Sequence, residues 1–219
     1  MMSAALLFIK ERRFLFLLLA LVNLILTPLY FFFIEGESPR VIVAISSLFV
    51  VLAGGAVCMK MKRTYITIGV LVVLMNGIEF FNSENLDIKC LRTVFSVALY
   101  SLMIRVILGY LISLKKVSLD DIFGAISGYL ILGLLGGSVY EFIYYLIPNS
   151  FSFNVSSFSD YIFYYYSFVG LSTVGFGDVV PTNPQSQSIT ILINMAGQFY
   201  MAIILTLFVS KYFNSLNNK

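Results

Sequence analysis

Near its C-terminal end the chain carries the stretch Thr173-Val174-Gly175-Phe176-Gly177-Asp178, in which two glycines alternate with large apolar residues. Glycine adopts backbone conformations that residues with a Cβ resist, so the chain can turn successive carbonyl oxygens to the same side. Four such strands around one axis would give stacked rings of oxygens that replace the water shell of a dehydrated cation, with the Thr173 hydroxyl at the inner end. Such a structure requires that the surrounding sequence place this stretch inside a membrane.

The composition is that of a membrane protein. Of the 219 residues 59% are hydrophobic and 11% are charged, against about 25% charged residues in soluble domains, and the mean hydropathy is +0.94. The chain has no His and only two cysteines, Cys58 and Cys90, which excludes a disulfide framework and removes the usual transition-metal ligands. No His/Cys/Asp cluster has the spacing of an active site, so we expect neither an enzyme nor a cofactor.

Six apolar segments reach or approach the roughly 20 residues that a membrane-spanning helix needs. They are residues 14–34, 41–59, 64–81, 93–114, 122–147 and 186–210. The first is too long for a secretory signal peptide and no small-residue cleavage site follows it, so it is expected to remain as a helix.

A further apolar segment, residues 158–172, lies between the last two spans and is too short to cross the membrane as a helix. Ser157 or Ser159 could cap its start, with Asp160 placed favourably near the positive end of the helix dipole. It leads into the glycine-containing stretch, and non-helical backbone at membrane depth is tolerated only where it is buried in protein or lines water. The sequence thus predicts an all-α integral membrane fold with six transmembrane helices, a re-entrant pore helix and a selectivity-filter loop.

The basic residues indicate the orientation. With the first span starting inside, only Arg40, Lys89 and Arg92 of the fourteen Lys and Arg residues fall in outer segments, and Arg105 falls within the fourth span. The other ten fall in inner segments, which places both termini in the cytoplasm by the positive-inside rule. Because the basic residues are spread over separate short loops, nucleic acid is not an expected partner.

The stretch from Ser172 to Asp178 resembles the signature of the potassium-channel family, in a GFG form in place of the commoner GYG. The pair Tyr165-Tyr166 resembles the aromatic pair that the family places on its pore helix, and Val169 lies where voltage-gated members tend to carry Val. The resemblance implies K⁺ sites at Thr173, Val174, Gly175 and Phe176, a filter completed by Gly177, and support from Asp178, Tyr165, Tyr166 and Val169. Phe176 lacks the hydroxyl that commonly ties the filter to this aromatic pair, so slow inactivation is expected to differ while selectivity survives.

Further along, Met195-Ala196-Gly197 resembles the inner-helix hinge of the family. A glycine inside a helix costs about 1 kcal/mol relative to alanine, so it often has a bending or packing role. A close contact with another helix is the alternative to a hinge. Beyond it a mostly polar stripe is expected to line a water-filled cavity, because polar side chains facing lipid are costly; its residues are Gln198, Ala202, Thr206 and Ser210.

Six spans with the filter between the last two resemble the voltage-gated cation-channel architecture, which implies a peripheral four-helix domain over residues 1–117 and a pore domain over residues 118–219. A voltage sensor needs several basic residues in its fourth helix, whereas the span 93–114 has only Arg105. One charge in each of four subunits supplies at most about 9 kcal/mol per 100 mV, so gating is expected to depend weakly on voltage or not at all. Arg105 is expected to snorkel inward or to pair within the bundle, with residual voltage sensing as the alternative.

The acidic residues of the spans have structural interpretations. Glu79 and Glu141 are expected at outer helix ends, where water solvates them, with packing behind the filter as an alternative for Glu141. The stretch Ser118-Leu119-Asp120-Asp121 predicts a capping box that opens the fifth span, although the adjacent carboxylates could instead bind a cation.

Only one filter segment is present and no internal repeat is visible, so four chains must assemble to close the ring. We therefore expect a potassium-selective channel subunit in the cell membrane, with three further pore-forming subunits and the lipid bilayer as partners and K⁺ as the permeant ion. The alternatives are a weakly selective cation channel and a non-conducting regulatory subunit of other channels.

Overall fold

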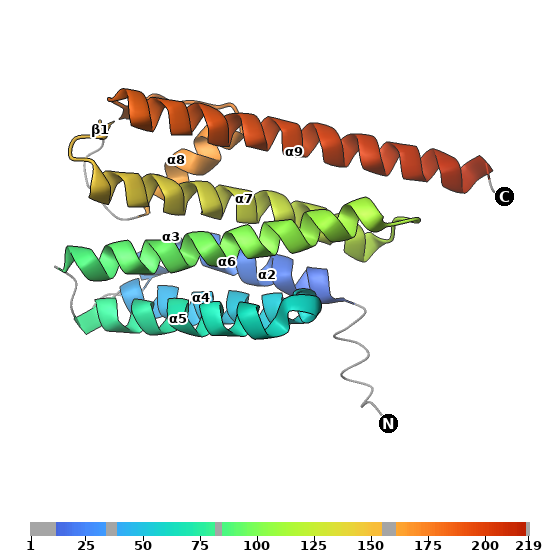
Figure 1. The fold of residues 1–219 in the computed structure, drawn as a ribbon, viewed down its shortest axis with the longest axis horizontal. Helices are drawn as coiled ribbons and strands as arrows, with labels where there is room; N and C mark the ends of the chain where they lie inside the picture. Colours follow the sequence, from blue (N-terminus) through green and yellow to red (C-terminus); the bar gives the residue numbers. More distant parts are fainter. Residues whose placement is uncertain (1–11, 34–38, 82–84, 155–160, 218–219) are drawn as a thin grey trace.

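The computed structural model describes residues 12–33, 39–81, 85–154 and 161–217, and these are almost entirely helical (Figure 1). The helices are α2 (Arg13–Ile25), α3 (Thr27–Phe33), α4 (Pro39–Val57), the 3₁₀ turn η1 (Met59–Met61), α5 (Lys62–Phe81), α6 (Leu86–Ser113), α7 (Leu119–Leu146), α8 (Ile162–Leu171) and α9 (Pro184–Asn217). Two short strands, β1 (Phe151–Phe153) and β2 (Val179–Pro181), pair antiparallel with Ser152 opposite Val180.

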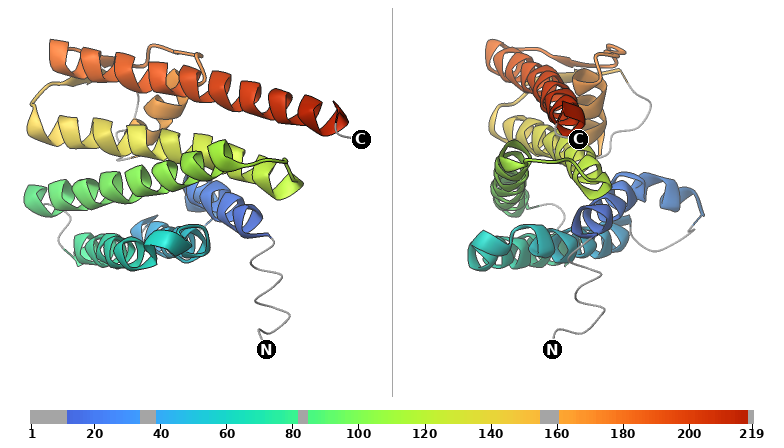
Figure 2. Two further views of the ribbon diagram at one scale, coloured as in Figure 1. Left: turned by 45° about the vertical axis from the view of Figure 1, so that its right-hand side comes forward. Right: turned by 90° about the vertical axis from the view of Figure 1, so that its right-hand side faces the viewer.

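The long helices lie in layers (Figures 1 and 2). Helices α2 to α6, here called the front helices, form one side of the molecule, and α9 lies along the opposite edge against α7 and α8. Helix α7 packs along α6 and also against α2. Only residues 114–118 join α6 to α7, so the front helices lie directly against the α7 of the same chain.

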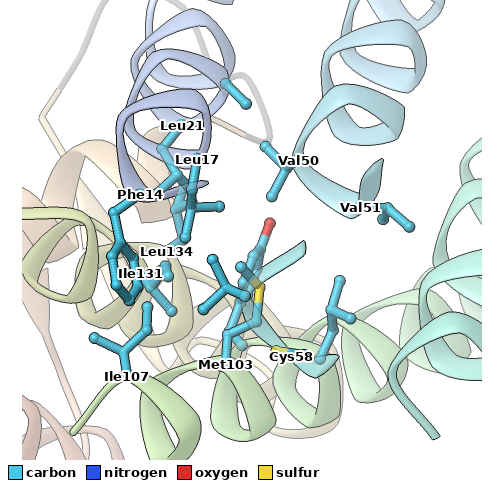
Figure 3. Packing of buried hydrophobic residues seen from close by; sticks show 14 of the residues in the cluster. Phe14, Leu17, Leu21, Val50, Val51, Cys58, Met103, Ile107, Ile131 and Leu134 are labelled. Atoms are coloured by element: carbon cyan, nitrogen blue, oxygen red, sulfur yellow. The ribbon is translucent and has the colours of Figure 1, made fainter. Parts of the chain in front are cut away.

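One buried cluster holds these layers together (Figure 3). Phe14, Leu17 and Leu21 of α2 meet Met103 and Ile107 of α6 and Ile131 and Leu134 of α7, and each of these side chains is at most 3% exposed. Burying an apolar side chain of this size contributes about 1.5–3 kcal/mol in water, and in lipid close packing provides the corresponding contacts. The cluster crosses the expected boundary at residue 117, and the division into two domains stays a prediction.

Three helices of the described residues are long and apolar enough to cross a membrane, namely α6, α7 and α9 up to Lys211. The segments Arg13–Ile25 and Ile42–Val57 are apolar but shorter. The chain is thus an all-helical membrane protein, in whose described parts three helices have spanning length, and six spans stay a prediction.

The first expected span is interrupted, and the prediction of one continuous helix over residues 14–34 is wrong. Helix α2 ends at Ile25 and α3 begins at Thr27. Pro28 has no N–H to donate to the carbonyl of Leu24, and its ring disfavours a continuous helix. The Thr27 hydroxyl donates to that carbonyl instead, at 2.7 Å, so the break leaves no unpaired acceptor there.

The predicted capping box at the start of α7 is confirmed. The Ser118 hydroxyl accepts from the Asp121 N–H at 3.3 Å, and the Asp121 carboxylate accepts from the Ser118 N–H at 2.8 Å. Asp120 accepts from the N–H of Leu15 at 3.2 Å, at the start of α2, and Tyr110 donates to Asp121 at 2.7 Å. Both carboxylates therefore have structural hydrogen bonds, which favours capping over the cation-binding alternative.

Replacing Ser118 by alanine is expected to lower the free energy of unfolding by about 1 kcal/mol, because the N–H of Asp121 loses its acceptor. Thermal unfolding of the detergent-solubilised protein measures the change. Ser101→Ala is the matched control, because Ser101 is an exposed residue in the middle of α6. Equal midpoints for the two variants would contradict the contribution of this cap.

Candidate functional site

The short helix α8 ends where the glycine-containing stretch begins, and the chain there turns back on the helix. The N–H groups of Val174 and Gly175 both point to the carbonyl of Val169, at 3.1 and 3.4 Å, and the N–H of Thr173 donates to the carbonyl of Gly170 at 3.0 Å. These bonds satisfy carbonyls that the end of a helix leaves unpaired. They also anchor the first half of the stretch to α8, where Val169 has a positioning role.

The stretch has the backbone conformation that its glycines allow. Gly175 has φ of +59° and Gly177 has φ of +77°, both in the left-handed region that residues with a Cβ rarely adopt. Thr173 also has a positive φ, +62°, which is a strained conformation for a β-branched residue. Strain of this kind costs about 1–3 kcal/mol and is concentrated at functional sites.

The carbonyl oxygens of the stretch are left without partners within the chain. Among the described residues, no N–H or side-chain donor is hydrogen-bonded to the carbonyls of residues 173–177. Residues 172–177 are all exposed, with Val174 at 56% and Phe176 at 69%. Within one chain these two side chains are therefore largely uncovered.

The C-terminal end of the stretch is held in place by Asp178. Its carboxylate accepts from the Tyr165 hydroxyl at 2.6 Å and from the N–H of Val179 at 3.1 Å, and its carbonyl accepts from the N–H of Asn154 at 2.7 Å. The first bond joins α8 to the stretch, and the last continues the pairing of β1 with β2. Asp178 and Tyr165 thus fix the far end of a segment whose near end is fixed by Val169.

Tyr166, the other predicted aromatic residue of α8, has a different environment. Its ring packs against Tyr140 at 5.0 Å and Phe151 at 5.8 Å between ring centroids, and its hydroxyl donates to Thr190 at 3.4 Å. Tyr166 therefore packs α8 against α7, β1 and α9, whereas Tyr165 contacts the stretch itself.

The C-terminal end of α8 contacts α9 at the predicted hinge. A Cβ on Gly197 would lie 2.2 Å from Cδ2 of Leu171, the last residue of α8. The neighbouring Gln198 donates to the carbonyl of Leu171 at 3.0 Å. The geometry supports the close-contact interpretation of Gly197, and its role as a hinge stays a prediction.

The stripe beyond Gly197 lies on the surface of the single chain. Gln198, Ala202, Thr206 and Ser210 are all exposed, and the Thr206 hydroxyl donates to the carbonyl of Ala202 at 2.8 Å. Their lining of a cavity stays a prediction. Near the end of α9, Lys211 donates to the carbonyl of Leu111 at 2.8 Å and so connects α9 to the end of α6.

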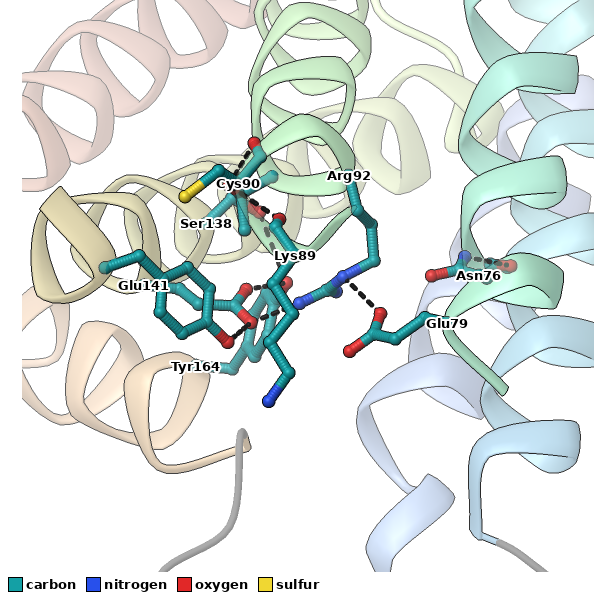
Figure 4. A network of polar contacts seen from close by, with 11 residues as sticks. Asn76, Glu79, Lys89, Cys90, Arg92, Ser138, Glu141 and Tyr164 are labelled. Atoms are coloured by element: carbon teal, nitrogen blue, oxygen red, sulfur yellow. Dashed lines mark hydrogen bonds and ion pairs between the residues drawn. The ribbon is translucent and has the colours of Figure 1, made fainter. Parts of the chain in front are cut away.

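A buried ionic cluster joins α5, α6 and α7 (Figure 4). It corrects the expectation that Glu79 and Glu141 are solvated. Glu79 and Glu141 are 8% and 0% exposed, so neither is a solvated residue at a helix end. Arg92 joins the two carboxylates. Its Nε lies 2.7 Å from Oε2 of Glu79 and forms an ion pair with it, without hydrogen-bond geometry. Its Nη2 donates a hydrogen bond to Glu141. Glu141 also accepts from the hydroxyls of Tyr145 at 2.9 Å and Tyr164 at 3.4 Å.

Arg92, which the sequence places in an outer segment before the fourth span, lies within a helix. Helix α6 begins at Leu86, with Asn85 as its N-cap accepting from the N–H groups of Asp87 and Ile88, so Arg92 lies in its second turn and is 9% exposed. The Asn85 cap was the sequence signal for this earlier start. Arg105, by contrast, is exposed on α6, and no ion pair with it is present among the described residues.

Comparison with known proteins bears on the second part of the chain. Residues 128–214 match the family model described as ion channel, and these residues cover most of α7, α8, the glycine-containing stretch and most of α9. No curated protein matches the chain. The segment that carries the candidate site is therefore similar to ion channels.

Proposed function

We propose that this protein is one subunit of a tetrameric potassium-selective channel, in which K⁺ crosses the membrane passively through the filter formed by residues 173–177. The supporting observation is the set of filter carbonyls that accept no hydrogen bond among the described residues. Once further copies enclose the filter, carbonyls without a partner would cost free energy, and a dehydrated cation held between rings of such oxygens would remove that cost.

The exposure of the filter supports assembly with further copies. In one chain the filter is exposed. Of the residues in the most apolar segment of α9 only 17% are buried, whereas 56% are buried in the corresponding segment of α7. Four copies around an axis would enclose both the filter and this face of α9. The partners are thus three further pore-forming subunits within the lipid bilayer of the cell membrane, with both termini cytoplasmic.

Within that assembly the contacts of each chain have defined roles. K⁺ is coordinated at Thr173, Val174, Gly175 and Phe176, while Val169 and the pair Tyr165 and Asp178 hold the two ends of the filter. Gln198 supports the inner end of α8 from α9, above a cavity lined by the remaining residues of the stripe. K⁺ is the permeant ion, and no cofactor is required.

Gating in this proposal is weakly dependent on voltage. Arg105 is the one basic residue in the span 93–114. Moving one charge per subunit through the whole field gives about 9 kcal/mol per 100 mV for four subunits, less than steep voltage gating requires.

The proposal is tested by reconstituting the purified protein alone in liposomes and measuring the reversal potential in opposed K⁺ and Na⁺ gradients. We expect a reversal potential close to the K⁺ equilibrium potential and little change of conductance with voltage. A reversal potential near zero would instead identify a weakly selective cation channel. No flux from correctly assembled protein would identify the non-conducting regulatory subunit.

A further inference from the structure

A cavity of about 810 Å³ is enclosed by the front helices, α7, α8 and the glycine-containing stretch. Volumes of this size accommodate drug-sized organic molecules, and the lining here is mostly apolar. Its aromatic residues come from α6, α7 and α8, from the turn before α8 and from the glycine-containing stretch; they are Tyr100, Tyr129, Tyr161, Tyr164, Tyr165, Phe168 and Phe176. The cavity thus offers an organic ligand several ring faces.

The cavity also has a charged end, formed by Glu79 and Arg92 (Figure 4). The Arg92 guanidinium is shared between Glu79 and Glu141, and Glu141 lies outside the lining. Two carboxylates against one guanidinium leave an excess formal charge of −1 when both are ionised. The nearby cation Lys89 does not line the cavity, because its Nζ lies 5.8 Å from the ring centroid of Tyr145 instead.

We infer that this cavity is a binding site for an amphipathic monocation, an organic ammonium with an apolar body. The ammonium lies at Glu79, where it compensates the excess negative charge, and the apolar body lies against the aromatic side chains. A cation above an aromatic face is attracted by the ring quadrupole, most strongly where water is excluded. A neutral analogue leaves the charge uncompensated, and an anion adds to it.

Fluorescence quenching tests this inference without measuring ion flux, so its result is independent of conduction. The chain has no Trp, so one introduced Trp is the only indole signal. Tyr129→Trp places the reporter in the cavity wall, and Leu19→Trp places a reference on the 56% exposed surface of α2, outside the cavity. The probes are 11-bromoundecyl-trimethylammonium, 11-bromoundecanol and 11-bromoundecanoate, which share one chain length and differ in head-group charge.

The measurement is made on the full chain in uncharged phosphatidylcholine vesicles, and the quenching at residue 129 is divided by that at residue 19 to correct for partitioning into the lipid. We expect the cation to half-quench the cavity reporter at a concentration about tenfold lower than the alcohol, and the carboxylate to quench least. Equal half-quenching by the cation and the alcohol would overturn the proposal.

A charge-neutralising variant tests whether the preference for the cation over the alcohol comes from the buried ionic cluster. Glu79→Gln keeps the shape of the side chain and removes the excess charge, so the cation should lose its advantage over the alcohol. Asp87→Asn removes the same formal charge from an exposed residue in the first turn of α6 and should leave the preference intact. A preference that persists in Glu79→Gln, or is lost equally in Asp87→Asn, would contradict binding at Glu79.

Discussion

Replacing Gly175 by alanine is expected to reduce potassium flux to that of protein-free vesicles. Gly175 has φ of +59°, and a residue with a Cβ pays about 1–2 kcal/mol in this region. The N–H of Gly175 is held at 3.4 Å by Val169, whereas its carbonyl has no partner among the described residues, so rotation of the peptide is the easiest way to relieve the strain. In the proposed tetramer, that rotation would remove one ring of oxygens in all four copies at once.

The measurement is the rate of K⁺ flux from liposomes that contain equal amounts of each variant. Gly77→Ala is the matched control, because a Cβ at Gly77 would meet nothing within 4 Å and this glycine lies in the helix α5. The control should conduct like the unmodified protein. Undiminished flux through Gly175→Ala would remove the stretch from the conduction pathway.

Replacing Arg92 by methionine is expected to lower the free energy of unfolding by about 3–5 kcal/mol, because it leaves two buried carboxylates without their cation. Arg92 of α6 links Glu79 of α5 to Glu141 of α7, so its loss also weakens the contact of α5 and α6 with α7. Thermal unfolding in detergent and the fraction of monodisperse protein report the effect.

The charge argument is separated from packing by a compensated variant. Arg92→Met combined with Glu79→Gln and Glu141→Gln removes all three charges, and its stability should recover most of the loss seen in Arg92→Met. Lys115→Met, which removes an exposed cation, should change the unfolding midpoint little. If the triple variant were as unstable as the single one, the packing of Arg92 and not its charge would account for the loss.

The backbone conformation of the glycine-containing stretch and the α7 cap could be predicted from the sequence because both depend on nearby residues. Two glycines at alternate positions permit the left-handed φ values of Gly175 and Gly177 wherever the stretch is placed. The bonds of Ser118 with Asp121 span three residues and form as the helix begins. Such features do not require knowledge of which helices are neighbours.

The ionic cluster could not be predicted in the same way, because its partners are far apart in the sequence. Arg92 and Glu141 are 49 residues apart, and only the packing of α6 along α7 brings them together. The distribution of apolar residues along the sequence suggests that Glu79 and Glu141 lie at solvated helix ends, because it contains no information on the cation that neutralises them. Similarly, the apolar content of residues 14–34 favoured one continuous helix, although Pro28 disfavours helix continuation and α2 ends at Ile25.

The connection of residues 114–118 has a consequence for channels of mixed composition. Five residues reach at most about 18 Å when fully extended, and α6 already packs along the α7 that follows it. In a tetramer built from different chains, each quadrant of the pore would therefore keep the front helices encoded with it. A change in the front helices of one chain would then affect only the pore quadrant of that chain, so its effect on the channel should grow with the number of altered chains incorporated.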